Sequence, residues 1–172
     1  IGNSAFAECK SLKSIVIPDS VTLIKNSAFE NCESLTTVEL SKNLKEINGA
    51  TFYYCPKLKE ITIPEGVTRI GEKAFYSCAA LTEVTVPESV TKISDYAFAY
   101  CKGLETVRIG IGVKQIGYRA FYYCSQLKDV YYSGSQSQWT MISIHSNNSE
   151  LLAATIHCLG PEHPHEFVTV VT

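Results

Sequence analysis

Apolar and polar positions alternate over short stretches of the chain, and each stretch predicts one short strand. From Leu81 to Val86 the order is L-x-x-V-x-V, so the last two apolar side chains, Val84 and Val86, are separated by one polar residue. A period of two is typical of a strand that buries one face. Pro87 follows directly, and because proline cannot donate to a strand ladder, we expect the strand to end there.

The residues between two such strands predict a return side and a corner. Val67 and Ile70 mark a second short extended stretch. Ala74, Phe75 and Cys78 follow with apolar spacings of three and four residues, which is typical of about one turn of helix that points Phe75 and Cys78 inward. Each unit is therefore expected to have a sheet side, a return side and a short helical or 3-10 corner.

The whole pattern repeats every 23 residues, and this repeat predicts the fold. The columns are Cys9, Cys32, Cys55, Cys78, Cys101 and Cys124; Phe6, Phe29, Phe52, Phe75, Phe98 and Phe121; and Leu12, Leu35, Leu58, Leu81, Leu104 and Leu127. One unit cannot bury these side chains alone, whereas coils stacked roughly 4.8 Å apart turn each column into a buried ladder. We expect a right-handed solenoid of about seven coils with parallel short strands.

The repeat L-x-x-V-x-I-P-x-x-V-x-x-I-G-x-x-A-F-x-x-C resembles the BspA-like leucine-rich repeat, a 23-residue class found in bacterial surface proteins. The resemblance covers residues 1–132 as six repeats, the first one truncated. The departures are Thr51 in the alanine column, Leu44 in the valine column, and Ser41, Gly110 and Ser133 in the proline column. The resemblance implies a leucine-rich repeat solenoid, an extracellular or cell-surface location, and a non-catalytic binding or adhesion module.

Residues 133–160 are expected to form a divergent C-terminal repeat and cap. Asn148, Leu151, Ala154 and Ile156 continue the pattern with a one-residue insertion, Asn148 replacing the column cysteine as a buried backbone partner. Trp139 lies 23 residues after Ile116, where a large indole is expected to plug the end of the core.

The two ends of the chain carry further expectations. Residues 161–172 contain two prolines and two histidines and are interpreted as a linker or the start of a next module. Ile1 begins in mid-coil, so the first coil is expected to present an open apolar end. Self-association through this N-terminal end is one expected interaction.

Charge and hydropathy exclude two classes of partner. The 172 residues carry 15 Lys and Arg against 17 Asp and Glu, a formal net charge of -2. This balance supplies no basic field for nucleic acid. No apolar run approaches the roughly 18 to 20 residues that span a bilayer. The sequence therefore predicts no nucleic-acid partner and no membrane insertion.

The cysteines and histidines do not predict a metal, cofactor or catalytic site. No C-x-x-C pair occurs, and no column cysteine has a histidine near it in sequence. Disulfides between adjacent coils fit in distance, but six equivalent inward thiols are expected to be free and to pack as small apolar groups. No nucleophile, phosphate-loop or zinc-protease motif appears. We therefore expect no cofactor, no metal and no enzyme activity.

The first candidate binding surface is a crowd of tyrosines just after the phenylalanine column. The predicted ligand-binding residues are Tyr53, Tyr54, Tyr76, Tyr100, Tyr122 and Tyr123, with Tyr96 and Tyr118 in adjoining columns. Early coils have Ala7, Glu8, Glu30 and Asn31 at the same places, so the fold does not demand aromatic rings there. Tyrosine is enriched in contacts with proteins and glycans, although inter-coil packing of half-buried rings would give the same pattern.

The second candidate surface is the outward face of the strands, which an ordinary solvated face would also resemble. Its residues are Glu39, Glu60, Glu83, Arg108 and Tyr131. Two function classes remain. The first is a binding or adhesion module that recognises a protein or glycan of a host or a cell wall. The second is an ancillary binding or spacer module attached to a secreted enzyme.

Overall fold

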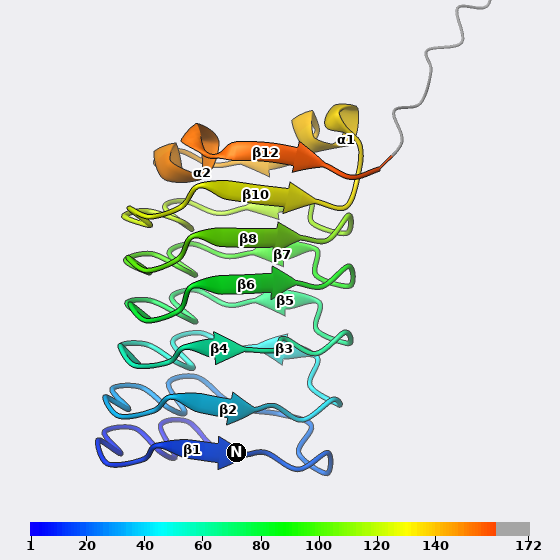
Figure 1. Cartoon of the computed structure of the whole chain (residues 1–172). Helices are drawn as coiled ribbons and strands as arrows, with labels where there is room; N and C mark the ends of the chain where they lie inside the picture. Colours follow the sequence, from blue (N-terminus) through cyan, green and yellow to red (C-terminus); the bar gives the residue numbers. More distant parts are fainter. Residues whose placement is uncertain (161–172) are drawn as a thin grey trace, which may run out of the picture.

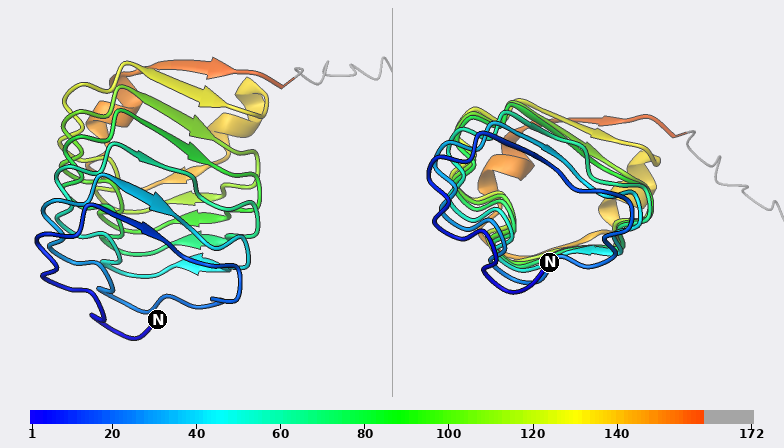
Figure 2. Two further views of the ribbon diagram at one scale, coloured as in Figure 1. Left: turned by 60° about the horizontal axis from the view of Figure 1, so that its bottom comes forward. Right: turned by 90° about the horizontal axis from the view of Figure 1, so that it is seen from below.

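The chain is a stack of flattened coils, as the computed structural model of residues 1–160 shows (Figure 1). Each strand pairs in parallel with the strand one coil away, so Ile15 lies opposite Val38 and Val84 opposite Val107. Viewed along the stack, the coils superimpose into one closed outline (Figure 2). The prediction of a parallel leucine-rich repeat solenoid is confirmed, with about six turns and little helix.

One long side of every coil contributes to a front sheet. Its strands are β1 (Ser14–Val16), β2 (Thr37–Glu39), β4 (Glu60–Ile61), β6 (Glu83–Val86), β8 (Thr106–Ile109), β10 (Asp129–Tyr132) and β12 (Thr155–Cys158). The first three and the last four form two ladders, which the single bridge between Thr62 and Thr85 joins. Val84 and Val86 point inward and are buried while Glu83 and Thr85 are exposed, as the period of two predicts.

The opposite side of the coils forms a back sheet of shorter strands. These are β3 (Glu46–Ile47), β5 (Arg69–Ile70), β7 (Lys92–Ile93), β9 (Gln115–Ile116) and β11 (Ser143–Ile144). Two five-residue helices, α1 (Gln136–Thr140) and α2 (Ser149–Ala153), lie at the C-terminal end of the stack (Figure 1). Within residues 1–160, neither helix has the length needed to cross a membrane.

The corner between the back and front strands consists of tight turns, so the prediction of a helical or 3-10 corner was wrong. Lys73 and Ser77 have φ values of 55° and 59°, which a right-handed helix does not allow. Hydrogen bonds alternate accordingly: the Ala74 N–H donates within its own turn to Gly71, whereas the Phe75 N–H donates 2.8 Å to the Ala97 carbonyl of the next coil. The corner therefore extends the inter-coil ladder.

The core consists of columns in which each side chain packs on its own counterparts. The Phe column stacks ring on ring, with centroids 5.1–5.5 Å apart and planes within 12° of parallel. Phe29 through Phe121 are fully buried, as are the column leucines from Leu35 to Leu104. Stacking thus supplies the burial that one coil could not provide.

The column cysteines are free thiols, as predicted, and those from Cys32 to Cys124 each donate to a backbone carbonyl. The Cys101 thiol donates 3.1 Å to the carbonyl oxygen of Phe75 in the preceding coil. The same bond recurs at 3.2–3.3 Å for Cys32, Cys55, Cys78 and Cys124. Burial raises the pKa of the Cys101 thiol to about 12 and raises the pKa values of Cys78 and Cys124. A small apolar residue with a weak donor suits this position.

The last coil ends the backbone ladder with side chains. The Asn148 Oδ1 accepts the Phe121 N–H at 3.0 Å, in place of the alanine carbonyl that a further coil would supply. Its Nδ2 donates 2.9 Å to the Gly117 carbonyl. Asn148 is buried, as predicted, and the Trp139 ring packs edge-on against Tyr132 at 5.4 Å. These contacts close the core at this end.

The predicted alignment of the last strand was wrong by two residues. Ile156 lies opposite Val130, and Cys158 lies opposite Tyr132, so Ala154 does not occupy the valine column. Helix α2 accommodates the extra residues between Leu151 and β12.

At the other end, the first coil exposes part of its apolar columns. Ile1, Phe6, Cys9 and Leu12 are only partly buried, whereas their counterparts in the second coil are fully buried. Self-association through this end stays a prediction. The predicted linker at 161–172 lies outside the described residues.

Candidate binding surfaces

The predicted tyrosines line the corner that precedes the front strands, which we call the tyrosine corner (residues 53, 54, 76, 96, 100, 118, 122 and 123). Tyr53 and Tyr76 stack with centroids 5.0 Å apart and planes 13° from parallel. Tyr100 and Tyr123 stack in the same way, at 5.2 Å and 14°. Tyr76 joins the two pairs because its ring lies 5.1 Å from that of Tyr100. The rings therefore form one run along four successive coils.

Two further rings complete the picture. Tyr122 packs edge-on against Tyr100 and Tyr123. Tyr54 makes no ring contact in the described structure and is 46% exposed, and Tyr123 is 48% exposed. The remaining predicted tyrosines are half-buried. The structure thus brings five of the six predicted residues together, as rings that pack on one another and also face solvent.

The backbone at four of these tyrosines is in the left-handed region. Tyr96 has a φ of 56°, and the other three share the position two residues after the column phenylalanine. Tyr54, Tyr100 and Tyr123 have φ values of 55°, 61° and 59°. Earlier coils place Glu8 and Asn31 at this position with the same backbone. Left-handed backbone favours glycine and asparagine and disfavours bulky residues. Local conformation therefore does not account for tyrosine here, and the reason must lie in what the side chains contact.

Arg119 lies among these rings and was missed in the sequence analysis. Its guanidinium carbon is 4.9 Å from the Tyr118 ring centroid and 4.7 Å from that of Tyr122. The Nε atom is buried without a hydrogen-bond partner. The two other arginines of the chain, Arg69 and Arg108, pair with carboxylates, whereas Arg119 forms no ion pair within residues 1–160. The tyrosine corner therefore contains an oriented, unneutralised cation.

The phenol groups are affected by their crowding. Burial, followed by the neighbouring Tyr100 and Tyr53, raises the pKa of Tyr76 above its usual value. The Tyr76 hydroxyl therefore stays neutral at physiological pH, where it can donate or accept a hydrogen bond.

The alternative surface, the front face, is organised around Arg108 and Tyr131. The Arg108 Nε donates 2.7 Å to the Glu83 carboxylate, and the guanidinium lies 4.7 Å from the Tyr131 ring centroid. His157 stacks on Tyr131 at 4.5 Å. Both faces of this ring are therefore covered. Sequence analysis missed His157 because the alignment of its strand was wrong.

The other predicted members of the front face lie apart from this cluster. Glu39 and Glu60 are exposed at the ends of β2 and β4, and neither forms an ion pair within the described chain. The front face therefore combines one ordered cluster with separate solvated carboxylates.

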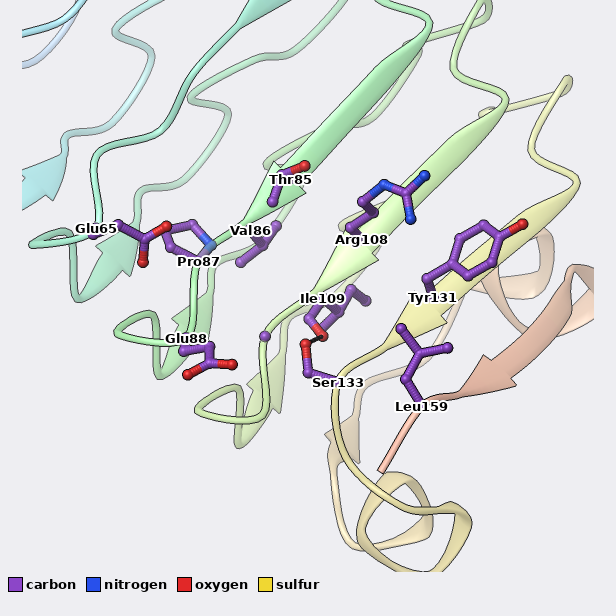
Figure 3. A pocket seen from close by; sticks show the side chains of 11 residues that line it. Glu65, Thr85, Val86, Pro87, Glu88, Arg108, Ile109, Tyr131, Ser133 and Leu159 are labelled. Carbon is purple, nitrogen blue, oxygen red and sulfur yellow. Dashed lines mark hydrogen bonds between the residues drawn. The ribbon is translucent and has the colours of Figure 1, made fainter. Parts of the chain in front are cut away.

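A hollow of about 270 Å³ lies beyond the C-terminal ends of β6, β8 and β10, and we call it the groove (Figure 3). Glu65 and Glu88 lie on one side of it, Tyr131 and Leu159 lie on the other, and Ser133 lies between them (Figure 3). The tyrosine corner precedes the front strands and the groove follows them, so the two surfaces lie at opposite ends of the front strands. Across residues 1–160, no group of three His, Cys, Asp or Glu side chains could hold a metal ion.

The repeats match a known family over most of the chain. Residues 1–128 match the BspA type leucine rich repeat region in six copies. Among curated proteins, none matches the chain.

Three solved structures are similar in both sequence and fold. A leucine-rich repeat protein from Bacteroides ovatus ATCC 8483 is 37% identical, with a TM-score of 0.73 over 76% of this chain and 34% of its own. The T. pallidum leucine-rich repeat protein is 35% identical, with a TM-score of 0.74 over 76% of this chain and 61% of its own. A leucine-rich cell surface protein from Faecalibacterium prausnitzii A2-165 is 35% identical, with a TM-score of 0.59 over 85% of this chain and 32% of its own. The chain therefore spans between 32% and 61% of the length of these proteins.

Proposed function

The chain belongs to the BspA-type leucine-rich repeat family, and on that premise we propose that it is a non-catalytic binding module of a secreted or cell-surface bacterial protein. Its contact surface in this proposal is the tyrosine corner, and its ligand is a protein or glycan of a host or a cell wall. One relative is itself described as a cell surface protein, which supports the location.

The observation that carries the proposal is the run of tyrosine rings at positions where the fold does not require them. Glu8, Asn31 and Tyr54 occupy equivalent positions, and each donates its N–H 2.8 Å to the next coil. The turn therefore forms equally well without an aromatic ring. Tyrosine and arginine are the residues that most often dominate binding energy at interfaces.

Arg119 favours an anionic group on the ligand. Two ring faces hold its guanidinium, so little side-chain freedom is lost when a partner binds. The planar guanidinium binds carboxylate, sulfate or phosphate groups through paired hydrogen bonds. An acidic side chain of a protein or an acidic sugar would supply such a group.

The ring geometry favours a protein over a neutral glycan. In the pairs Tyr53–Tyr76 and Tyr100–Tyr123 the stacked faces contact each other, so these rings offer mainly edges and hydroxyl groups. Sugars pack best on a free aromatic face, whereas edges and hydroxyl groups suit the mixed apolar and polar contacts of a protein interface.

Binding to arrays of glycans and purified extracellular proteins would test this function. We expect wild type to bind at least one target, and Arg119→Gln to weaken that binding about tenfold, since losing a charge-assisted contact costs roughly 1.5–3 kcal/mol. Arg69→Gln is the matched control because it removes a paired arginine from the back sheet.

Equal binding by Arg119→Gln and Arg69→Gln would show that the tyrosine corner is not the contact surface. If wild type bound nothing on either array, the spacer role beside a secreted enzyme would be favoured over a binding module.

A further inference from the structure

We infer that the groove is a second binding site, separate from the tyrosine corner, and that it takes a lysine side chain of a partner protein. The groove lies at the opposite end of the front strands and shares no residue with the tyrosine corner. The inference therefore stands whether or not the tyrosine corner binds a ligand.

The groove forms where the proline column is interrupted. Pro64 and Pro87 each place a ring at the end of a front strand, but Gly110 and Ser133 occupy this column in the next two coils. A Cβ on Gly110 would lie 2.6 Å from backbone atoms of Pro87 and Glu88, so the turns pack too closely for a larger residue. The hollow lies beside these closely packed turns, and Pro87 bounds it on one side and Leu159 on the other.

The charge of the groove favours a cation. Glu65 and Glu88 are equivalent residues of successive coils, so their like charges are neighbours on one wall. Neither forms an ion pair within residues 1–160. The Lys45 ammonium lies near Gly66, where it would be 3.5 Å from an added Cβ, yet it pairs with neither carboxylate. A bound cation would relieve the repulsion between these two groups.

The one cation in the lining is already engaged. Arg108 pairs with Glu83, packs on Tyr131, and points away from Glu65 and Glu88 (Figure 3). It therefore leaves the two carboxylates for a partner.

The remaining walls suit the stem of a lysine. Pro87, Leu159 and the edge of Tyr131 are apolar, and Leu159 is 64% exposed within residues 1–160. A lysine buries its four-carbon stem along such surfaces while its ammonium stays at the polar end. The compact ammonium has three donors and can contact two carboxylates together, whereas the flat guanidinium of arginine is best matched to a single carboxylate.

A sugar is a poorer occupant of the groove. Sugar rings bind on exposed aromatic faces, but Arg108 covers one face of Tyr131 and His157 covers the other. The only aromatic ring in the lining therefore offers its edge.

Backbone NMR of the full chain, titrated with N-acetyl-lysine N-methylamide, tests the site. We expect shifts at the Gly110, Ser133 and Leu159 amides that saturate in the millimolar range, as for any single side chain. The Nζ-acetylated probe and the norleucine analogue should give shifts at these amides only at several-fold higher concentration. Shifts of equal size with the norleucine analogue would overturn the inference, as would the absence of shifts with the lysine probe.

Variants with matched charge changes sharpen the test. Glu65→Gln combined with Glu88→Gln should weaken lysine binding about fivefold, because both charge contacts of the ammonium are lost. Glu60→Gln removes the same charge from the front face outside the groove and should leave binding unchanged. Equal effects of Glu60→Gln and Glu88→Gln would show that only the overall field attracts the probe, and would contradict a built site.

Discussion

Two aromatic columns run next to each other through the molecule, and they differ in what the fold requires. The Phe column occurs in all six repeats, with rings fully buried from Phe29 to Phe121 and planes within 12° of parallel. The adjacent tyrosines begin only in the third coil, and their ring planes differ by up to 82°. Phe75 and Tyr76 are neighbours in sequence, yet one ring is fully buried and the other is half exposed.

The solenoid fold requires the column phenylalanines, whereas it does not require the adjacent tyrosines. Each phenylalanine from Phe29 to Phe98 packs between its two counterparts, so changing one leaves a cavity in a continuous column. The tyrosine positions accept Ala7 and Glu30 in the early coils while the turn stays the same. A residue that varies while its backbone does not is a candidate for contact with something outside the chain.

The largest expected difference between the two columns is in their contribution to stability. Phe75→Ala should lower the free energy of unfolding by about 3–5 kcal/mol, whereas Tyr76→Ala should cost clearly less because that ring is half exposed. Urea unfolding followed by circular dichroism would measure both. A cost below about 1 kcal/mol for Phe75→Ala would contradict a core role for the column.

The caps of the two columns should differ in the same direction. Asn148 accepts the N–H of Phe121, and Glu150 accepts the N–H of Tyr123 at 2.9 Å. Asn148→Ala leaves buried groups unpaired and should cost about 1–3 kcal/mol. Glu150→Ala exposes the Tyr123 N–H to water and should cost less than about 1 kcal/mol. Thermal unfolding of both variants would measure the two costs, and equal costs would contradict the difference between the two columns.

A smaller effect concerns alkaline pH. The folded pKa of Cys101 is about 12, above its ordinary value of 9.0, because burial disfavours the thiolate. Its contribution to stability is therefore complete below pH 9 and is lost as pH rises through the folded value. Between pH 8 and pH 9.5 we expect a loss of under about 1 kcal/mol, since one pKa unit corresponds to 1.36 kcal/mol. Cys101→Ala should flatten this part of the profile; an unchanged slope would show that this thiol does not contribute.

The repeated columns could be predicted from sequence because each buried position of the repeat occurs six times at the same spacing. The corner could not, since apolar spacings of three and four residues fit a tight turn as well as a helix. Only the left-handed backbone at Lys73 and Ser77 distinguishes the two, and nothing in those side chains announces it.

The candidate surfaces were predictable only in part. The grouping of the tyrosines follows from their positions one or two residues after the column phenylalanines. The position of Arg119 against two ring faces depends instead on how the coils stack. His157 was hidden because α2 takes up extra residues before β12. The groove brings together residues of three coils and Leu159, which follows the misaligned last strand, so its lining could not be predicted from the repeat pattern.

The most direct test of the distinction between the two columns is one variant measured twice. Tyr54→Asn, Tyr100→Asn and Tyr123→Asn together place in three coils the residue type that Asn31 provides in the second, on the same left-handed backbone. The variant loses four ring contacts. For each substituted residue, the free energy of unfolding should fall by less than it does in Phe75→Ala, because each ring contact contributes roughly 0.5–1.5 kcal/mol and asparagine suits this backbone. Binding to the array targets of wild type should fall at least about tenfold. A folded variant that binds as well as wild type, or one that loses as much stability for each substituted residue as Phe75→Ala does, would contradict the account.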